Sequence, residues 1–198
     1  MLKKQIQFAW VRGLFTGRIV VFAALLFVVA TNGFSQATSW TGGGGDFLWT
    51  NPSNWSSGVP VNITGSVTIP ADVASPITAV PTISLAGLTI NGSCWLQGDA
   101  IPASPNTITV TSSFSVAASK TFELGSGAVR INFILSSSAS GTINGTVSIN
   151  SGATPRFFQN DGDLTLSSTG LINETASPSI FTLGATGTLR IGSPAGIT

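Results

Sequence analysis

Hydrophobic and polar residues alternate along most of the chain from Ser66 onward. Segments such as Ser66-Val67-Thr68-Ile69 and Thr146-Val147-Ser148-Ile149 make every second side chain apolar. A period of two predicts strands that bury one face. The same alternation recurs at 107–111, 113–116, 121–124, 163–166 and 188–191. No long window after Ala37 has helical spacing, so the pattern predicts an all-β protein.

Turns centred on glycine and asparagine separate the predicted strands. They include Asn91-Gly92, Gly125-Ser126-Gly127, Asn144-Gly145, Ser151-Gly152, Asp161-Gly162 and Gly184-Ala185-Thr186-Gly187. Both residue types tolerate positive φ, so they suit tight corners. These turns could close two-residue hairpins, or they could form the corners of a coil.

Two features favour the coil. Similar strand–turn units recur at intervals of roughly 20 residues, as in 88–90 followed by 108–110, which is typical of a solenoid. The outward residues are mostly uncharged Ser, Thr and Asn, which tolerate stacking at about 4.8 Å better than like charges do. The sequence therefore predicts a right-handed parallel β-helix with roughly six or seven coils after Ser66. An antiparallel β-sandwich is the alternative fold.

A Trp- and Gly-rich stretch, Trp40 to Pro60, precedes the alternating region and holds three of the five tryptophans. The end of a solenoid exposes strand edges and open core, so it needs a cap. We expect residues 38–65 to form that cap and residues 66–198 to form the solenoid repeats. No comparable stretch occurs near Thr198, which suggests a fragment or the N-terminal part of a larger protein.

The first 37 residues have the pattern of an export signal. A basic segment ends at Arg18, twelve apolar residues follow from Ile19 to Ala30, and small residues stand at Ser35 and Ala37. This pattern predicts a helical secretory signal peptide, residues 1–37, cleaved after Ala37. A membrane anchor is the alternative, but a span takes about 20 apolar residues. We therefore expect a secreted or outer-surface protein with no membrane span in its mature chain.

Composition narrows the possible functions. Charged residues make up only 8% of the chain, and four of the eight basic residues precede residue 19. The remainder carries four basic and seven acidic residues, a net charge of −3, which argues against a nucleic-acid partner. Histidine is absent, which excludes Ser-His-Asp and Cys-His catalysis and the usual His-based zinc sites. The single cysteine, Cys94, can form no intrachain disulfide and is expected to be a small buried apolar residue.

A family resemblance rests on two segments. They are Trp40-Thr-Gly, Trp49, Asn54-Trp55, Gly58-Val-Pro60 and Val67-Thr-Ile-Pro70 near the start, and the repeat-like Leu183 to Ile197 near the end. Residues 38–198 resemble the N-terminal region of large surface repeat proteins from Gram-negative bacteria with a type IX secretion system. The resemblance implies an adhesin-like β-helix and a C-terminal sorting domain for surface attachment. This chain contains no such domain.

Few residues suggest a binding site. Trp40, Trp49 and Trp55 could stack on sugar rings, although a buried cap is the favoured interpretation; Trp95 is expected in the core or at the solenoid edge. Asn160-Asp161-Gly162-Asp163 has oxygen ligands but lacks the EF-hand spacing, which favours a solvated turn over a calcium site. Carboxylates for glycoside cleavage would come from Asp99, Glu123, Asp161 and Asp163, but no spacing pairs them.

These observations favour a structural or adhesin-like β-helix region of a larger protein, with no catalysis, cofactor or metal of its own. Its partner would be an extracellular polysaccharide or a host or cell surface. The alternative is a β-helix that binds or cleaves carbohydrate. A truncated reading frame without function is the third possibility.

Overall fold

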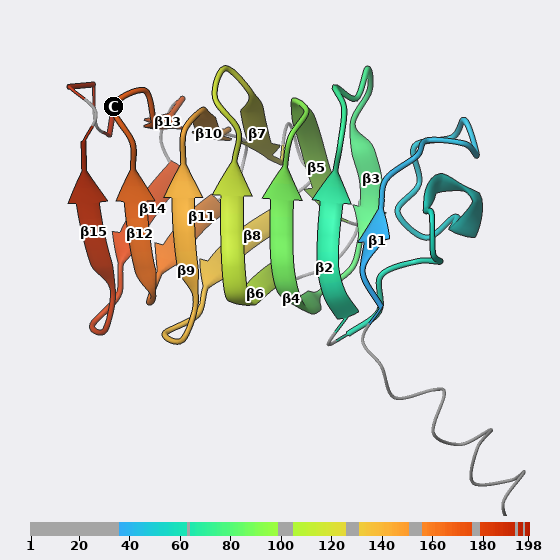
Figure 1. Ribbon diagram of the computed structural model, residues 1–198, viewed down its shortest axis with the longest axis horizontal. Coiled ribbons are helices and arrows are strands. Elements are labelled where there is room, and N and C mark those ends of the chain that lie inside the picture. The colour runs from blue at the N-terminus through green and yellow to red at the C-terminus, as the bar shows by residue number, and fades with distance from the viewer. Residues whose placement is uncertain are drawn as a thin grey trace, which may run out of the picture. The chain divides into compact units, whose positions relative to one another are not determined.

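The computed structural model describes residues 36–62, 64–98, 105–125, 131–150, 156–175, 179–192, 194–195 and 197–198. These residues form fifteen strands and a short 3-10 helix, Pro52–Asn54. The named strands pair in parallel and wind into a β-solenoid of about five turns (Figure 1). The predicted parallel β-helix is confirmed, and the alternative antiparallel β-sandwich is wrong.

The predicted signal peptide, residues 1–37, lies outside the described residues except for Gln36 and Ala37. Its cleavage and export stay predictions. In the part of the chain that the structure describes, no helix has the length and hydropathy of a membrane span.

The strands form three stacks, and a full turn of the solenoid adds one strand to each stack. The first stack holds the N-terminal halves of β4 (Ile83–Ile90) and β6 (Asn106–Val116), then β8 (Ile131–Leu135), β11 (Arg156–Asn160) and β14 (Ser179–Leu183). The second holds β1 (Thr38–Ser39), β2 (Thr64–Ile69), the C-terminal halves of β4 and β6, β9 (Ser140–Ile143), β12 (Asp163–Leu166) and β15 (Thr188–Ile191). The third holds β3 (Ile77–Val80), β5 (Cys94–Gly98), β7 (Thr121–Leu124), β10 (Thr146–Ile149) and β13 (Leu171–Glu174).

The repeat of the solenoid is longer than predicted. Residues paired between neighbouring turns are commonly 25 positions apart, as are Phe133 with Phe158 and Thr121 with Thr146. The expected repeat of roughly 20 residues and the expected six or seven coils are therefore wrong.

The predicted repeat was too short because strands of two different stacks were taken as successive repeats of one strand. Leu88 pairs with Phe114 in the second stack, whereas Ile108 pairs with Ile83 in the first. All three stacks alternate between buried and outward residues, so alternation by itself does not identify the stack to which a strand belongs.

The inward side chains form one continuous core. Phenylalanines from successive turns occupy its centre, and the ring centroids of their contacting pairs lie 4.7 to 6.1 Å apart. These residues are Phe114, Phe122, Phe133, Phe158 and Phe181. Tilted and edge-on ring pairs at such distances add to the stabilisation from buried area. The core therefore runs along the axis without a break between turns.

The Gly- and Asn-centred turns within the described residues are corners, because the strands on either side belong to different stacks. Gly145 shows why glycine is required at one of them. A Cβ there would lie 2.2 Å from the carbonyl oxygen of Lys120 and 2.3 Å from that of Ala117. Neighbouring turns thus approach too closely at this corner for any larger residue.

Hydroxyl groups at other corners tie one turn to the next. Thr169 Oγ1 donates to the carbonyl oxygen of Asn144 at 2.6 Å, and Thr186 Oγ1 donates to that of Asp161 at 2.8 Å. Each bond satisfies a carbonyl left unpaired by the strand ladder. Corner Ser and Thr residues therefore add to the register between turns.

Candidate functional site

The three tryptophans of the predicted cap are buried. The exposed fractions are 5% for Trp40, 0% for Trp49 and 5% for Trp55. Trp55 packs edge-on against both others, with ring centroids 5.1 Å from Trp40 and 4.7 Å from Trp49, and its Nε1 donates to the Trp49 carbonyl at 2.7 Å. Rings covered in this way have no free face for a sugar, so their burial favours the stabilising role.

The cap continues the strand ladder. β1 pairs in parallel with β2, and the Trp40 N–H donates to the Thr68 carbonyl at 2.9 Å. Further along, the Trp49 N–H donates to the Thr78 carbonyl at 2.9 Å. The segment from Thr38 to Trp49 therefore lies on the second and third stacks like an additional turn, and the chain then returns so that Trp55 pairs with Trp40 in an antiparallel bridge.

Asp46 holds the cap loop together. Its carboxylate accepts hydrogen bonds from the Leu48 N–H at 3.1 Å, Asn51 Nδ2 at 2.8 Å and Asn54 Nδ2 at 2.7 Å. These bonds, that from Asn51 first, lower the pKa of Asp46. Asn54 is fully buried and its Oδ1 accepts from the Gly44 N–H at 2.8 Å, so the glycine run is part of the same network.

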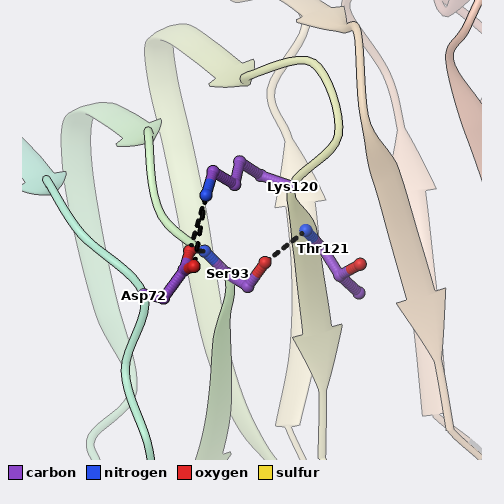
Figure 2. A network of polar contacts seen from close by, with 4 residues as sticks. All are labelled: Asp72, Ser93, Lys120 and Thr121. Atoms are coloured by element: carbon purple, nitrogen blue, oxygen red, sulfur yellow. Dashed lines mark hydrogen bonds and ion pairs between the residues drawn. The ribbon is translucent and has the colours of Figure 1, made fainter.

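A second polar network joins three turns beside the cap (Figure 2). Asp72 accepts from the Ser93 N–H at 2.7 Å and from Lys120 Nζ at 2.9 Å, while Ser93 Oγ accepts from the Thr121 N–H at 3.2 Å. Lys120, as the main cause, lowers the pKa of Asp72. A hollow of about 290 Å³ lies next to Asp72, bordered by Trp40 and the Ala71–Ala74 corner. These contacts join the corners of three neighbouring turns, which indicates a structural tie between turns.

The polar side chains of the segment from Asn160 to Asp163 contact other parts of the protein. Asn160 is fully buried and donates to the Thr188 carbonyl at 2.9 Å. Asp161 accepts from Gln159 Nε2 at 2.7 Å, and Asp163 forms an ion pair with Arg190. The described residues contain no group of three or more Cys, Asp or Glu side chains that could hold a metal. The carboxylates are thus used by neighbouring side chains.

Among the carboxylates of the described residues, Glu123 is the one whose pKa is raised. It stands on the outer side of the third stack, where Trp95 and Ser148 are its register neighbours. Asn150 Nδ2 donates to it, and Ser148 Oγ donates to Asn150 Oδ1 at 3.1 Å. Partial burial raises the pKa of Glu123, an effect that the bond from Asn150 opposes. An aromatic ring, a carboxylate and an amide therefore adjoin on one surface.

Two further candidates are Cys94 and Asp99. Cys94 is 4% exposed, and burial, followed by the charge of Glu123, raises the pKa of its thiol. The thiol therefore stays neutral and inert. Asp99 lies outside the described residues, so its prediction as a carboxylate for glycoside cleavage stays untested.

The outer side of the second stack carries two straight rows of mostly hydroxyl residues, which together we call the hydroxyl face. Outer row one is Ser39, Thr68, Thr89, Ser115, Thr142, Thr165 and Arg190. Outer row two is Ser66, Gly87, Ser113, Ser140, Asp163 and Thr188. The strands that carry them lie side by side toward the viewer in Figure 1. Ten of these thirteen positions are Ser or Thr.

The other two stacks lack this regularity. Outward positions of the first stack include Ile134 and Gln159, in register with Thr109. Those of the third stack include Trp95 and Glu123. Serine and threonine are common throughout the chain, but only the register of the turns reveals their concentration on one stack. The motif of two outward hydroxyls separated by one apolar residue, as in Ser66-Val67-Thr68, was the signal available in the sequence.

Comparison of the chain with protein-family models, curated protein sequences and solved structures found no match. The resemblance to type IX secretion-type repeat proteins therefore stays a prediction.

Proposed function

We propose that the chain is a secreted or cell-surface β-helix that serves as a structural or adhesin-like region of a larger protein, without catalysis of its own. The observation that supports this role most directly is the parallel ladder that continues from β1 to β15 around a single core. In such a ladder every turn is held by strands on three sides. A rigid spacer or display platform needs that property.

The chemistry of the surface agrees with a scaffold. Within the described residues, the only two ion pairs are Asp72–Lys120 and Asp163–Arg190. Uncharged outward residues allow turns to stack at about 4.8 Å without like-charge repulsion. A surface of this kind presents repeated hydroxyl groups over a long distance.

Export is tested by expressing the whole chain in a Gram-negative host and sequencing the N-terminus of the exported protein. We expect it to begin at Thr38. The double variant Leu25→Arg/Leu26→Arg interrupts the apolar segment and should stay in the cytoplasm, whereas Lys3→Arg should be exported normally. An exported protein that begins at Met1, or one that never leaves the cytoplasm, contradicts the proposed localisation.

Adhesion is tested with beads that carry the purified protein, exposed to cells and to immobilised polysaccharides. Binding that depends on the protein supports an adhesin-like role. If the beads bind no more than albumin-coated beads, the protein acts as a spacer and not as an adhesin.

A second candidate function is carbohydrate binding on the third stack, supported by the adjacency of Trp95 and Glu123. Aromatic rings pack against the apolar faces of sugars, while carboxylates and amides accept and donate hydrogen bonds. A panel of soluble oligosaccharides titrated by calorimetry tests it. Binding that is lost in Trp95→Ala and kept in Thr121→Ala supports this site. Binding that survives Trp95→Ala excludes it, and release of reducing ends would indicate cleavage.

A further inference from the structure

The hydroxyl face carries side chains whose hydroxyls are not used within the protein. Thr68, Thr89, Thr142 and Thr165 make no side-chain hydrogen bond to any described residue, in contrast to corner residues such as Thr169. A hydroxyl group can donate once and accept twice. The rows therefore offer unsatisfied donors and acceptors to whatever lies against the sheet.

The strand register fixes the spacing of these groups in two directions. Neighbouring turns place equivalent residues about 4.8 Å apart, and residues two positions apart on one strand lie about 6.6 Å apart. Outer row one and outer row two therefore form a rectangular array of hydroxyls. Threonine is branched at Cβ and therefore restricted at χ1, which limits the orientations that its hydroxyl takes from turn to turn.

We propose that the hydroxyl face binds ice, by holding water molecules in the positions that they take in the crystal lattice. Oxygen atoms on planes of hexagonal ice repeat at distances close to these two spacings. A rigid array loses little conformational freedom when it meets a rigid lattice. This binding activity goes beyond the scaffold role and does not depend on it.

Charge supports ice as the occupant. The two rows contain one acid and one base, Asp163 and Arg190, which form an ion pair with each other. The face is therefore neutral, as an ice surface is. It also contains no aromatic side chain, which makes it a poor match for the crystalline polysaccharides that aromatic rings recognise.

Strand stability alone does not explain why Ser and Thr residues are concentrated on the second stack. Cross-strand Thr pairs stabilise sheets, but the first and third stacks are equally in need of stable strands. Their outward rows nevertheless contain Ile134, Gln159, Trp95 and Glu123. Evenly spaced hydroxyls on one stack alone indicate a ligand whose own groups are evenly spaced.

The test measures how much of the purified protein is incorporated into a slowly growing ice front, together with inhibition of ice recrystallisation. We expect the wild-type protein to be enriched in ice and to stop grain growth. Thr142→Lys should lose most of this enrichment because the long side chain lifts the lattice from the array. Thr109→Lys, on the outer side of the first stack, should behave as wild type.

Circular dichroism melts establish that the variants are folded, and Thr142→Ser provides a milder change that keeps the hydroxyl. Retention of activity in Thr142→Ser, with loss in a folded Thr142→Lys, supports the proposal. Wild-type protein that enters ice no more than albumin overturns it, as does equal loss in Thr109→Lys. Binding to crystalline cellulose or chitin with no enrichment in ice also overturns it and assigns the face to polysaccharide.

Discussion

The two ends of the solenoid bury their apolar side chains very differently. At the first end, Trp40, Trp49 and Trp55 are at most 5% exposed. In the last turn, Leu183 is 50% exposed and Ile191 is 53% exposed, although both continue the inward rows of the core. In a stack of turns, a core side chain is fully buried only when a turn packs against it from above and from below. Contact with a single turn covers only about half of the side chain.

The first end reaches full burial through large side chains and a crossing chain. The loop that contains Asp46 folds Trp55 back against Trp40 and Trp49, so the rings cover each other as well as the first turn. Within the described residues, β14 and β15 have ladder partners on one side, and their aliphatic residues are too small to cover the core alone. The difference shows that closing a solenoid takes a change of path as well as apolar residues.

The largest effect is expected for Trp49→Ala. Removal of a fully buried tryptophan typically costs about 3–5 kcal/mol, and here it would also remove a partner of Trp55. Urea unfolding followed by circular dichroism measures the loss. Leu189→Ala in the half-buried last turn is the matched control and should cost much less. Equal losses at both ends would contradict the assigned role of the cap.

A smaller effect is expected for Asp46→Asn, and it should depend on pH. The pKa of Asp46 lies below its ordinary value of 3.8, so its contribution to stability is present above pH 3.8 and is lost as the pH falls through the folded-state pKa. The variant should be less stable than wild type at pH 7 and similar to it in strong acid. Tryptophan fluorescence of a Trp95→Phe background reports this, because Trp40, Trp49 and Trp55 are then the tryptophans of the described residues and all lie in the cap. A variant as stable as wild type at pH 7 would contradict the role given to Asp46.

Glu123→Gln, in the middle of the solenoid, should show the opposite sign. The pKa of Glu123 lies above its ordinary value of 4.5, so its contribution to stability is present below pH 4.5 and is lost as the pH rises through the folded-state pKa. Glutamine keeps an acceptor for Asn150 and carries no charge. The variant should therefore melt slightly higher than wild type at pH 7 and equally in acid. A lower melting temperature at pH 7 would mean that the carboxylate charge is stabilising.

The smallest effect on stability is expected for Leu183→Ser. A half-exposed side chain in the last turn contributes little, and surface substitutions usually stay within about 0.5 kcal/mol. The same change should reduce self-association, because Leu183, Ile180 and Ile191 are exposed apolar residues on the edge strands β14 and β15. Light scattering against concentration checks this, with Ser168→Ala at an exposed corner as the control. Unchanged scattering would show that the edge is not adhesive.

The sequence predicted the strands, the parallel solenoid and the Trp-rich cap because each rests on a local signal. Alternation such as that at Ser66–Ile69 marks a strand, and low charge distinguishes stacked turns from a sandwich. The repeat length was not predictable in this way. It depends on which strand lies beneath which, and imperfect repeats such as Leu88–Ile90 and Ile108–Val110 fit two alignments.

The surface features were harder to predict for the same reason. The adjacency of Trp95, Glu123 and Asn150 joins residues from three turns, and nothing in the spacing 95, 123, 150 identifies them without the 25-residue register. The hydroxyl face likewise combines common residues whose meaning comes only from their alignment. The burial of single residues is easier to predict, since Trp49 and Cys94 are residue types that are usually buried.

The 25-residue register also has a mechanical consequence. The ladder hydrogen bonds run along the solenoid axis, so a force that pulls the two ends apart puts the same tension on every layer of bonds, and the layers break one after another. Each turn can peel away while the next remains intact, and it releases about 80–90 Å of extended chain. Under tension the molecule lengthens in nearly equal steps, and each broken turn dissipates energy before the next one breaks.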